Sequence, residues 1–330
     1  MKRAQLEKAV AIVGPTASGK TSLSIALAKE FGGEIVSADS RQLYRGTTIC
    51  TAIPEGEWRS FGGRRALMIE GVSHYMLAAY SPAKMITMGQ YRERAAWRLR
   101  EIASRKKLPM LVGGTGLYVR AVVDGFAVPP VEPNPELRAR LEKLDTGQLY
   151  SMLLDRDQAY AKSISPNNKR YIIRALEVIE ATGERFSELQ KRRVGSDFPA
   201  VGGTPPSLKT KDMWRGDFLQ IGVELPREEL YRRIDARVDQ MIACGLPEEA
   251  RRLARRYGWE APIIAGTLGY AQLRGHFLGE YGLDEAVRLI KRDTRHYARR
   301  QLIWLRRDER IRWVKSIKEA ASELRRFLER

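Results

Sequence analysis

The chain has 330 residues, of which 43% are hydrophobic, and 58 lysine and arginine residues against 40 aspartate and glutamate residues give it a net charge of +18. That length allows two domains, or one domain with a large insertion. No stretch approaches the ~18 consecutive apolar residues of a membrane span. Residues 1–8 contain no apolar signal segment, so we expect a cytoplasmic protein with no membrane partner.

The first predicted strand, residues 9–13, leads directly into residues 14–21, which match the phosphate-binding motif G-x-x-x-x-G-K-S/T, and a helical pattern follows at 21–31. This strand–loop–helix context is the one that the motif requires. Backbone N–H groups of the loop and the helix N-terminus would then point at an anion. The residues predicted to bind the anion are Gly14, Thr16, Ala17, Ser18, Gly19, Lys20 and Thr21. The alternative is a glycine turn before an ordinary amphipathic helix.

Further strands are predicted at 33–38, 107–112 and 218–225, and further helices at 88–106 and 227–244. Strands that alternate with helices form a wound parallel sheet, which binds ligands beyond the carboxyl ends of its strands. The phosphate loop, Asp39 and the glycine-rich stretch 113–116 all follow such ends, so we expect them to meet. Asp39 could bind Mg²⁺, act as a general base or only cap a turn, and Thr115 could contact a substrate or only cap a helix.

The strand pattern disappears between residues 126 and 204. Prolines at 129, 130, 133 and 135 open this region, helical patterns follow at 135–144, 146–154 and 167–182, and prolines at 205 and 206 close it. We therefore predict a P-loop NTPase-like wound parallel α/β core made of residues 1–125 and 205–330, whose C-terminal part is helical and basic. Residues 126–204 would form a helical insertion domain.

The basic residues gather in four clusters, at 92–107, 170–193, 251–256 and 288–312. Several clusters contain or adjoin tyrosine or tryptophan, a combination suited to phosphates and stacked bases, so nucleic acid is a candidate partner. Arg227 follows the fourth predicted strand. It could bind a polyphosphate through its forked guanidinium or simply face solvent.

Metal ligands are sparse in this sequence. The two cysteines and three histidines are too scattered for a disulfide framework or a zinc site. Mg²⁺ needs few protein ligands when it is shared with phosphates. We therefore expect Mg²⁺ as the cofactor, with the Thr21 hydroxyl as its protein ligand.

An ordered set of motifs runs along almost the whole chain. It comprises the phosphate loop, Ser-Ala-Asp-Ser-Arg-Gln-Leu-Tyr-Arg-Gly at 37–46, Leu-Pro-Met-Leu-Val-Gly-Gly-Thr-Gly-Leu-Tyr at 108–118, Pro-Asn at 166–167, Ile-Ile-Arg-Ala-Leu-Glu-Val at 172–178, Leu-Gly-Tyr at 268–270 and Thr-Arg-His-Tyr-Ala-Arg-Arg-Gln-Leu-Ile-Trp at 294–304. In these residues the chain resembles the tRNA dimethylallyltransferases, also called tRNA isopentenyltransferases. That family moves a dimethylallyl group from dimethylallyl diphosphate to the exocyclic amine of the tRNA adenine just 3′ of the anticodon.

The resemblance implies a role for each matching residue. Asp39 would accept the amine proton, and Thr115 and Arg227 would lie near the reacting centre and the diphosphate. The adenine would leave its stack to reach the allyl carbon. The residues implied to contact the tRNA anticodon stem-loop are Ser40, Arg41, Gln42, Arg138, Arg170, Arg174, Gly269, Tyr270, Arg300 and Gln301. The insertion domain would grip the anticodon stem, and the enzyme would act as a monomer.

Other functions remain open at this point. The phosphate loop alone also fits a small-molecule kinase, and a related enzyme could prenylate free AMP. A tRNA-binding member of the family with little activity is a further alternative. It is suggested by Cys50, Ile53, Ala78 and Ser81, which stand where the family usually has glycine, lysine and two aspartates.

Overall fold

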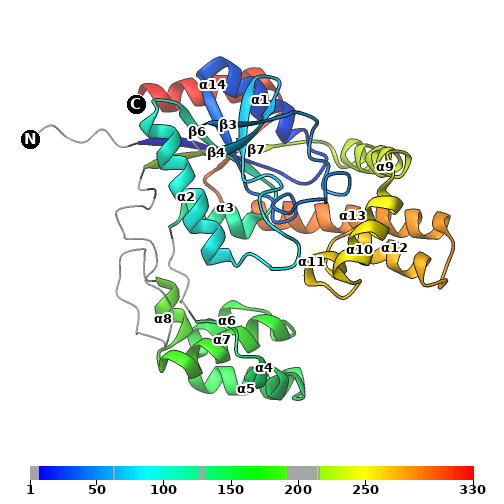
Figure 1. Ribbon diagram of the computed structural model, residues 1–330. Helices are drawn as coiled ribbons and strands as arrows, with labels where there is room; N and C mark the ends of the chain where they lie inside the picture. The colour runs from blue at the N-terminus through cyan, green and yellow to red at the C-terminus, as the bar shows by residue number, and fades with distance from the viewer. Residues whose placement is uncertain (1–6, 62–63, 126–130, 192–213, 215) are drawn as a thin grey trace, which may run out of the picture. The chain divides into compact units, whose positions relative to one another are not determined.

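The structure is a computed structural model that describes residues 7–61, 64–125, 131–191, 214 and 216–330. The chain divides into two compact units. Met1–Val123 together with Trp214–Arg330 form the core unit, and Asp124–Met213 form the insertion unit. The core unit contains the sheet, whereas the described residues of the insertion unit are helices and their connections (Figure 1).

The core unit is built on one eight-stranded sheet, ordered β3-β4-β5-β2-β6-β1-β7-β8. Its strands are β1 (Lys8–Val13), β2 (Gly33–Ser37), β3 (Glu57–Phe61), β4 (Arg64–Ile69), β5 (Val72–Tyr75), β6 (Leu108–Gly113), β7 (Asp217–Val223) and β8 (Ile311–Val314). From β5 to β8 every pairing is parallel, whereas β4 pairs antiparallel with both β3 and β5. The predicted wound parallel α/β sheet is confirmed, with each of its four predicted strands present.

Helices cover both faces of this sheet. They are α1 (Lys20–Phe31), α2 (Met88–Ser104), α3 (Gly116–Val123), α9 (Arg227–Ala243), α10 (Leu246–Tyr257), α11 (Pro262–Ala265), α12 (Tyr270–Phe277), α13 (Leu283–Leu305) and α14 (Ile317–Glu329). α1 and α14 lie on one face and α2 and α3 on the other, while α9–α13 gather beyond one edge (Figure 1). In the part of the chain that the structure describes, none of the helices has the length and apolarity needed to cross a membrane.

The main core lies around β1 because helices cover that strand on both sides. Every residue from Ala9 to Val13 is 0% exposed, which explains why the strand is a continuous apolar run rather than an alternating one. Ile12, Met110 and Ile221, from three adjacent strands, pack together in this core with residues of α1 and α14. The phosphate loop is thus attached to a strand at the centre of the buried core.

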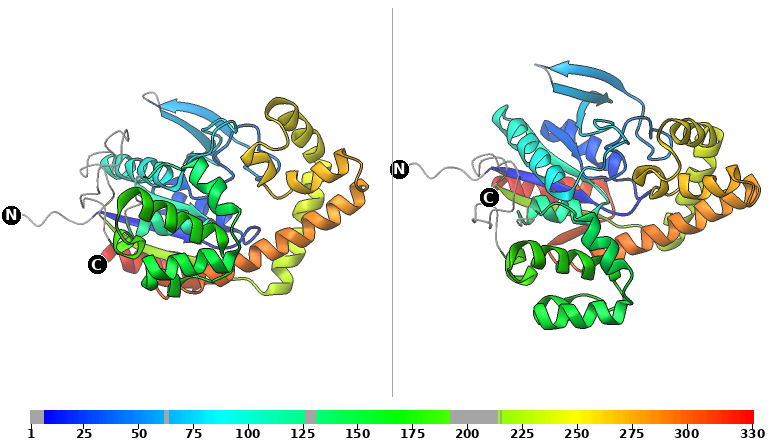
Figure 2. Two further views of the ribbon diagram at one scale, coloured as in Figure 1. Left: turned by 90° about the horizontal axis from the view of Figure 1, so that it is seen from below. Right: turned by 60° about the horizontal axis from the view of Figure 1, so that its bottom comes forward.

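The strands that sequence analysis missed lie at the margins of the sheet. β3, β4 and β5 form an antiparallel extension, and Figure 2 shows the β3–β4 pair, drawn in light blue, projecting from the rest of the core unit. β3 has the sequence Glu-Trp-Arg-Ser-Phe, and its described side chains are exposed, so it carries little of the apolar pattern of a strand. β8 spans only Ile311–Val314 between two helices.

The insertion unit has its own apolar core. Its helices are α4 (Pro135–Glu142), α5 (Thr146–Arg156), α6 (Gln158–Ser163), α7 (Lys169–Thr182) and α8 (Phe186–Lys191). Leu149, Leu153, Ile172 and Leu176 lie in that core, and each is at most 1% exposed. Side-chain caps start α4 at Asn134 and α5 at Asp145, and a cap of this kind stabilises a helix by ~1 kcal/mol.

A buried carboxylate holds the insertion helices together. Glu177 of α7 is 1% exposed. It accepts hydrogen bonds from Arg138 Nε and Nη2 at 2.8 and 2.7 Å, from Arg174 Nη1 at 2.5 Å and from the Asn134 N–H at 2.7 Å. Burial alone would raise the pKa of this carboxyl, but the donors outweigh burial and lower it. Arg138 and Arg174, predicted to contact tRNA, are both engaged by the insertion unit's own carboxylate, and 41% of the Arg138 side chain remains exposed.

We expect Glu177→Gln to destabilise the insertion unit by about 2 kcal/mol, since hydrogen bonds to a charged group contribute about 1.5–3 kcal/mol. In the wild type this contribution is complete above the usual glutamate pKa and is lost as the pH falls through the lowered pKa of the folded state. Hydrogen exchange of the α4 and α7 amides in the full chain measures the loss.

The matched control is Glu180→Gln on the same helix, because Glu180 pairs with Arg140 in an exposed ion pair. This change should cost less than about 0.5 kcal/mol. Equal amide protection in the two variants would contradict the assignment of Glu177.

Candidate active site

The phosphate loop leaves β1 at Val13 and enters α1 at Lys20. Its backbone turns through Ala17 and Gly19, whose φ angles of 60° and 90° lie in the left-handed region, and glycine adopts that region without strain. α1 begins with no side-chain cap and no acidic residue in its first turn. The N–H groups and the positive end of the helix dipole therefore face an anion site without a competing carboxylate.

Lys20 is the cation of this loop. Its Nζ donates to the Pro15 carbonyl, so the side chain folds back over the loop. Burial lowers the pKa of Lys20 to about 8, the negative charge of Asp39 opposes that shift, and the positive charge of Arg237 adds to it. The ammonium is therefore near two charged groups that come from other parts of the sequence.

Asp39 follows β2 and organises the turn after it. Its Oδ1 accepts hydrogen bonds from the Arg41 N–H at 2.8 Å and the Gln42 N–H at 3.4 Å. This is the turn-capping role that the sequence left open. The carboxylate also influences the pKa of Lys20 and of Arg237, so one residue both shapes the backbone and places a negative charge beside two cations.

Thr115 and Tyr297 lie on the other side of this turn. The Thr115 Oγ1 accepts from the Ser40 N–H at 3.0 Å, and the Thr115 N–H donates to the Ala38 carbonyl at 3.2 Å. The Tyr297 hydroxyl of α13 lies near Thr115. Burial raises the pKa of Tyr297 to about 12, and the charge of Asp39 contributes to that rise. The structure thus places Thr115 beside Asp39, as the sequence predicted.

Gln301 of α13 links the two glycine-rich loops. Its Oε1 accepts from the Thr16 N–H at 2.9 Å, and its Nε2 donates to the Gly114 carbonyl at 2.7 Å. A Cβ on Gly114 would lie 2.4 Å from that Nε2, so only glycine allows this approach. Gln301 was predicted to contact tRNA. In the structure the residue is 7% exposed, and both ends of its amide are occupied by the two loops.

Arg237 is a site residue that the sequence analysis missed. It comes from α9, and its Nη2 donates to the Thr51 carbonyl at 3.3 Å. Burial lowers the pKa of its guanidinium, whereas the negative charge of Asp39 opposes that shift. An arginine that is desolvated next to a carboxylate and a lysine is well placed to bind a polyanion.

Arg227, the arginine predicted for this role, lies at the start of the same helix. It is exposed, and its guanidinium lies 5.1 Å from the ring centre of Tyr231. Arg237, ten residues further along α9, is the arginine of this helix that lies near Asp39 and Lys20. The overlooked signal was the position of Arg237 next to Val238, on the buried stripe that begins with Leu230 and Ile234.

Ser40, Arg41 and Gln42, predicted to contact the target base, are all half-buried around the Asp39 turn. The Arg41 Nη2 donates to the Gly266 carbonyl at 2.7 Å, and the Gln42 Nε2 donates to the Thr51 carbonyl at 3.1 Å. Arg41 and Gln42 therefore connect this turn to two neighbouring segments. Their exposure is sufficient for contact with a substrate.

The remaining predicted contacts fall into two groups. Arg170 of α7 and Arg300 of α13 are exposed, as residues that meet RNA must be. Gly269 and Tyr270 are buried, and Tyr270 is 0% exposed with its hydroxyl donating to Glu249 Oε1 at 2.7 Å. Tyr270 is therefore packed inside the apolar cluster of α10 and α12, where it presents no surface.

The loop offers hydroxyl groups suited to Mg²⁺ that arrives with phosphates. Ser18 Oγ is buried without a hydrogen-bond partner, and Thr21 is exposed at the start of α1. The described part of the chain holds no group of three or more His, Cys, Asp or Glu side chains able to bind a metal. Mg²⁺ needs only one or two protein ligands when phosphates and water complete its shell, so the residues present fit this ion.

Comparisons with known proteins agree with one another. The IPP transferase family model matches residues 42–308, and the isopentenyl transferase model matches residues 7–61. The tRNA dimethylallyltransferase of Roseiflexus sp. is 44% identical over 303 residues, which cover 90% of each chain. The tRNA dimethylallyltransferase of Geobacter metallireducens is 40% identical over 319 residues, which cover 95% of this chain and 94% of the relative.

Solved structures share the fold. The tRNA isopentenylpyrophosphate transferase of Bacillus halodurans gives a TM-score of 0.66 at 32% identity, covering 98% of this chain and 96% of that one. A eukaryotic dimethylallyltransferase acting on tRNA gives a TM-score of 0.69 at 25% identity, covering 91% of this chain and 70% of that one. The predicted P-loop NTPase-like fold class is therefore confirmed.

The placement of the two arginines can be tested with inorganic pyrophosphate. We expect Arg237→Gln to weaken the binding of pyrophosphate about 10- to 100-fold, because it removes one or two charge-assisted hydrogen bonds. Arg227→Gln is the control on the same helix and should change the affinity less than ~2-fold. Isothermal titration calorimetry gives both affinities. A larger loss in Arg227→Gln than in Arg237→Gln would assign diphosphate binding to Arg227.

Proposed function

Because the chain belongs to the IPP transferase family, we propose that it transfers a dimethylallyl group from dimethylallyl diphosphate to the exocyclic amine of the tRNA adenine just 3′ of the anticodon. The chain is a tRNA prenyltransferase, and this family assignment favours group transfer over the kinase alternative. The observation that carries the substrate and chemistry is the juxtaposition of Asp39 with Lys20 and Arg237. A base beside two cations suits a reaction that releases a proton and an anion together.

The phosphate loop and Arg237 would bind the diphosphate. N–H groups at the start of α1, the Lys20 ammonium and the guanidinium would neutralise the charge that grows on pyrophosphate as the allylic C–O bond breaks. Mg²⁺ held by Thr21 and the phosphates would add charge stabilisation of the same leaving group. The pre-existing positive charge of the pocket makes pyrophosphate a better leaving group than it is in water.

Asp39 would receive the proton. As the adenine nitrogen forms its bond to the allylic carbon, the nitrogen becomes more acidic and its proton passes to the carboxylate. A positioned carboxylate of this kind typically contributes about 10²–10⁴-fold in rate. Thr115 and Tyr297 would fix the turn that carries Asp39, since Thr115 bonds to the Ser40 N–H and lies near Tyr297.

Exposed basic residues of both units would bind the tRNA anticodon stem-loop in the cytoplasm, with the protein acting as a monomer. In the insertion unit, Arg170 and Tyr171 begin α7 and are exposed, which offers a cation and an aromatic ring together. In the core unit, Arg300 is exposed on α13, and Ser40–Gln42 are half-buried around the Asp39 turn. We expect all of them to contact the same RNA. Phosphate contacts of this kind orient the RNA, and the adenine then flips out of its stack.

The first test is the transfer of labelled dimethylallyl groups into bulk tRNA that lacks the modification. Asp39→Asn should lower kcat about 10²–10⁴-fold and change both KM values less than ~3-fold, because asparagine keeps the Oδ1 that caps the turn but cannot take the proton. Asp39→Ala removes both functions. A wild-type protein that binds tRNA without any incorporation would contradict the proposed reaction and favour the low-activity alternative.

The lowered pKa of Lys20 predicts a pH dependence. Since that pKa is about 8, the unliganded protein loses the ammonium proton above this pH, and the diphosphate then binds more weakly. The Kd for dimethylallyl diphosphate should be constant below pH 8 and rise toward ~tenfold per pH unit above it. Calorimetric titrations across this range measure the effect. Lys20→Met should bind weakly with no such dependence, and a flat wild-type profile would refute the assignment.

A further inference from the structure

A separate cavity of about 360 Å³ lies in the core unit, outside the residues of the candidate active site. Its lining includes Arg45, Ile53, Glu55, Trp58, Arg65 and Leu67. Ile53 and Leu67 are 8% and 3% exposed and form an apolar floor, while two arginines and a glutamate supply charge around it. We call this cavity the Trp58 pocket. Its volume is at the lower end of small-molecule sites, which suits one nucleotide rather than a larger ligand.

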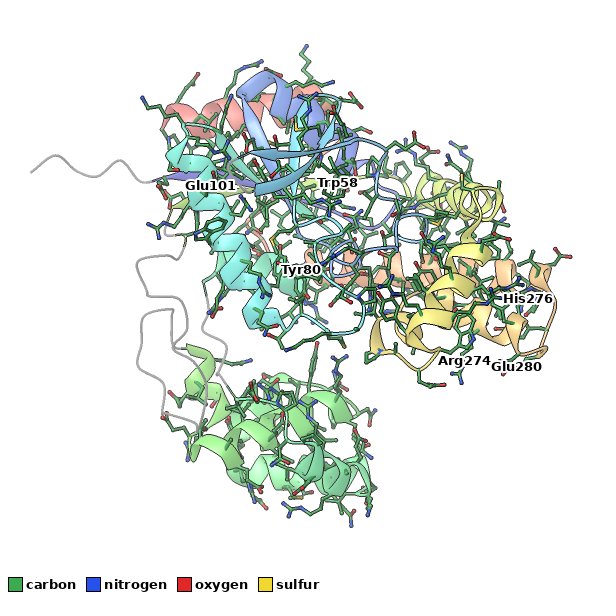
Figure 3. The ribbon with its side chains drawn as sticks, viewed as in Figure 1. Trp58, Tyr80, Glu101, Arg274, His276 and Glu280 are labelled. Atoms are coloured by element: carbon green, nitrogen blue, oxygen red, sulfur yellow. The ribbon has the colours of Figure 1, made fainter. Side chains whose placement is uncertain are left out.

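The β3–β4 pairing builds the aromatic wall of the pocket. Trp58 is paired with Leu67, and Arg65 lies two residues before Leu67 on β4. Residues two apart point to the same face of a strand, so these three side chains share one face. The Arg65 guanidinium lies 4.0 Å from the ring centre of Trp58. It covers part of the indole, yet 38% of Trp58 remains exposed (Trp58 is labelled in Figure 3).

The pocket adjoins the reaction site through the backbone. Arg45 follows directly on the Asp39 turn, and its N–H donates to the Tyr80 carbonyl at 2.8 Å. Ala78, which also lines the pocket, donates its N–H to the Gln42 carbonyl at 2.8 Å. The turn that positions Asp39 is therefore continuous with the wall of the Trp58 pocket.

We propose that the Trp58 pocket binds one further nucleotide of the substrate RNA, near the adenine that reacts. The base stacks on the open part of the indole, and Arg45 and Arg65 contact its phosphate. An exposed tryptophan beside arginines is the usual platform for an unpaired base. This inference rests on the proposed function, because it takes RNA as the substrate. A free nucleotide has the same chemistry, so the experiment must separate the two sources.

The experiment compares steady-state prenylation of an anticodon stem-loop RNA by wild type, Trp58→Ala and Trp58→Phe. We expect Trp58→Ala to raise the KM for RNA about 5- to 150-fold, because one base of the RNA loses its stacking partner. The kcat and the KM for dimethylallyl diphosphate should stay within ~2-fold. Trp58→Phe keeps a stacking ring and should recover most of the affinity. It also remains informative if alanine disturbs the hairpin.

The chain offers a matched control. Trp97 of α2 is 41% exposed, and the Arg98 guanidinium lies 4.8 Å from its ring centre, but Trp97 does not line the pocket. Trp97→Ala should change the KM for RNA less than ~2-fold. Arg65→Gln should reduce the slope of log KM against log salt concentration by about 0.7–0.9, as expected for one lost phosphate contact.

Three outcomes decide the proposal. An unchanged KM for RNA in folded Trp58→Ala, with no binding of AMP or UMP at the pocket, would overturn it. Nucleotide binding that depends on Trp58, with an unchanged KM for RNA, would assign the pocket to a free nucleotide and also overturn it. A KM for RNA that rises in Trp58→Ala but not in Trp97→Ala would support it. If wild type transfers nothing, the proposed function fails, and the Kd of the same variants for the stem-loop still tests the pocket.

Discussion

Adjacent strands of a parallel sheet lie only about 4.8 Å apart, and the site depends on this spacing. β2, β6 and β1 are neighbours, so the segments that leave their carboxyl ends occupy one small volume. The Thr115 N–H reaches the Ala38 carbonyl across that gap, and Gln301 joins the loops after β1 and β6. Groups that are distant in sequence are thereby held within reach of one substrate.

The charged groups in this volume suit a site that binds an anion through two cations and accepts a proton on a carboxylate. Asp39 is a carboxylate near Lys20 and Arg237, and burial disfavours the charged form of both cations, since it lowers the pKa of each. A bound diphosphate would supply the negative charge that these groups lack. Binding of the leaving group therefore prepares the site electrostatically before the RNA base reacts.

Sequence reasoning located the parts of the site that lie at strand ends. The phosphate loop, Asp39 and Thr115 could be placed because strand–loop–helix patterns fix where such residues go. It failed for side chains that arrive from helices of the C-terminal part. The apolar stripe of α9 indicates that the face carrying Arg237 is buried, but not what that face meets. The positions of Gln301 and Tyr270 likewise depend on how α13 and α12 pack. The β3–β4 hairpin was missed because its exposed residues lack the apolar signature of a strand.

Glu249 of α10 binds the N–H groups of Ile49 and Cys50 at 2.9 Å each. The Cys50 thiol fills space left by Gly269, where any Cβ would lie 2.9 Å from the sulfur, and it donates to the Leu268 carbonyl at 2.9 Å. Gly269 has a φ of +99°, so its own backbone already requires glycine there. Position 50 can therefore hold a side chain larger than glycine, because the backbone at Gly269 leaves room for the Cys50 sulfur.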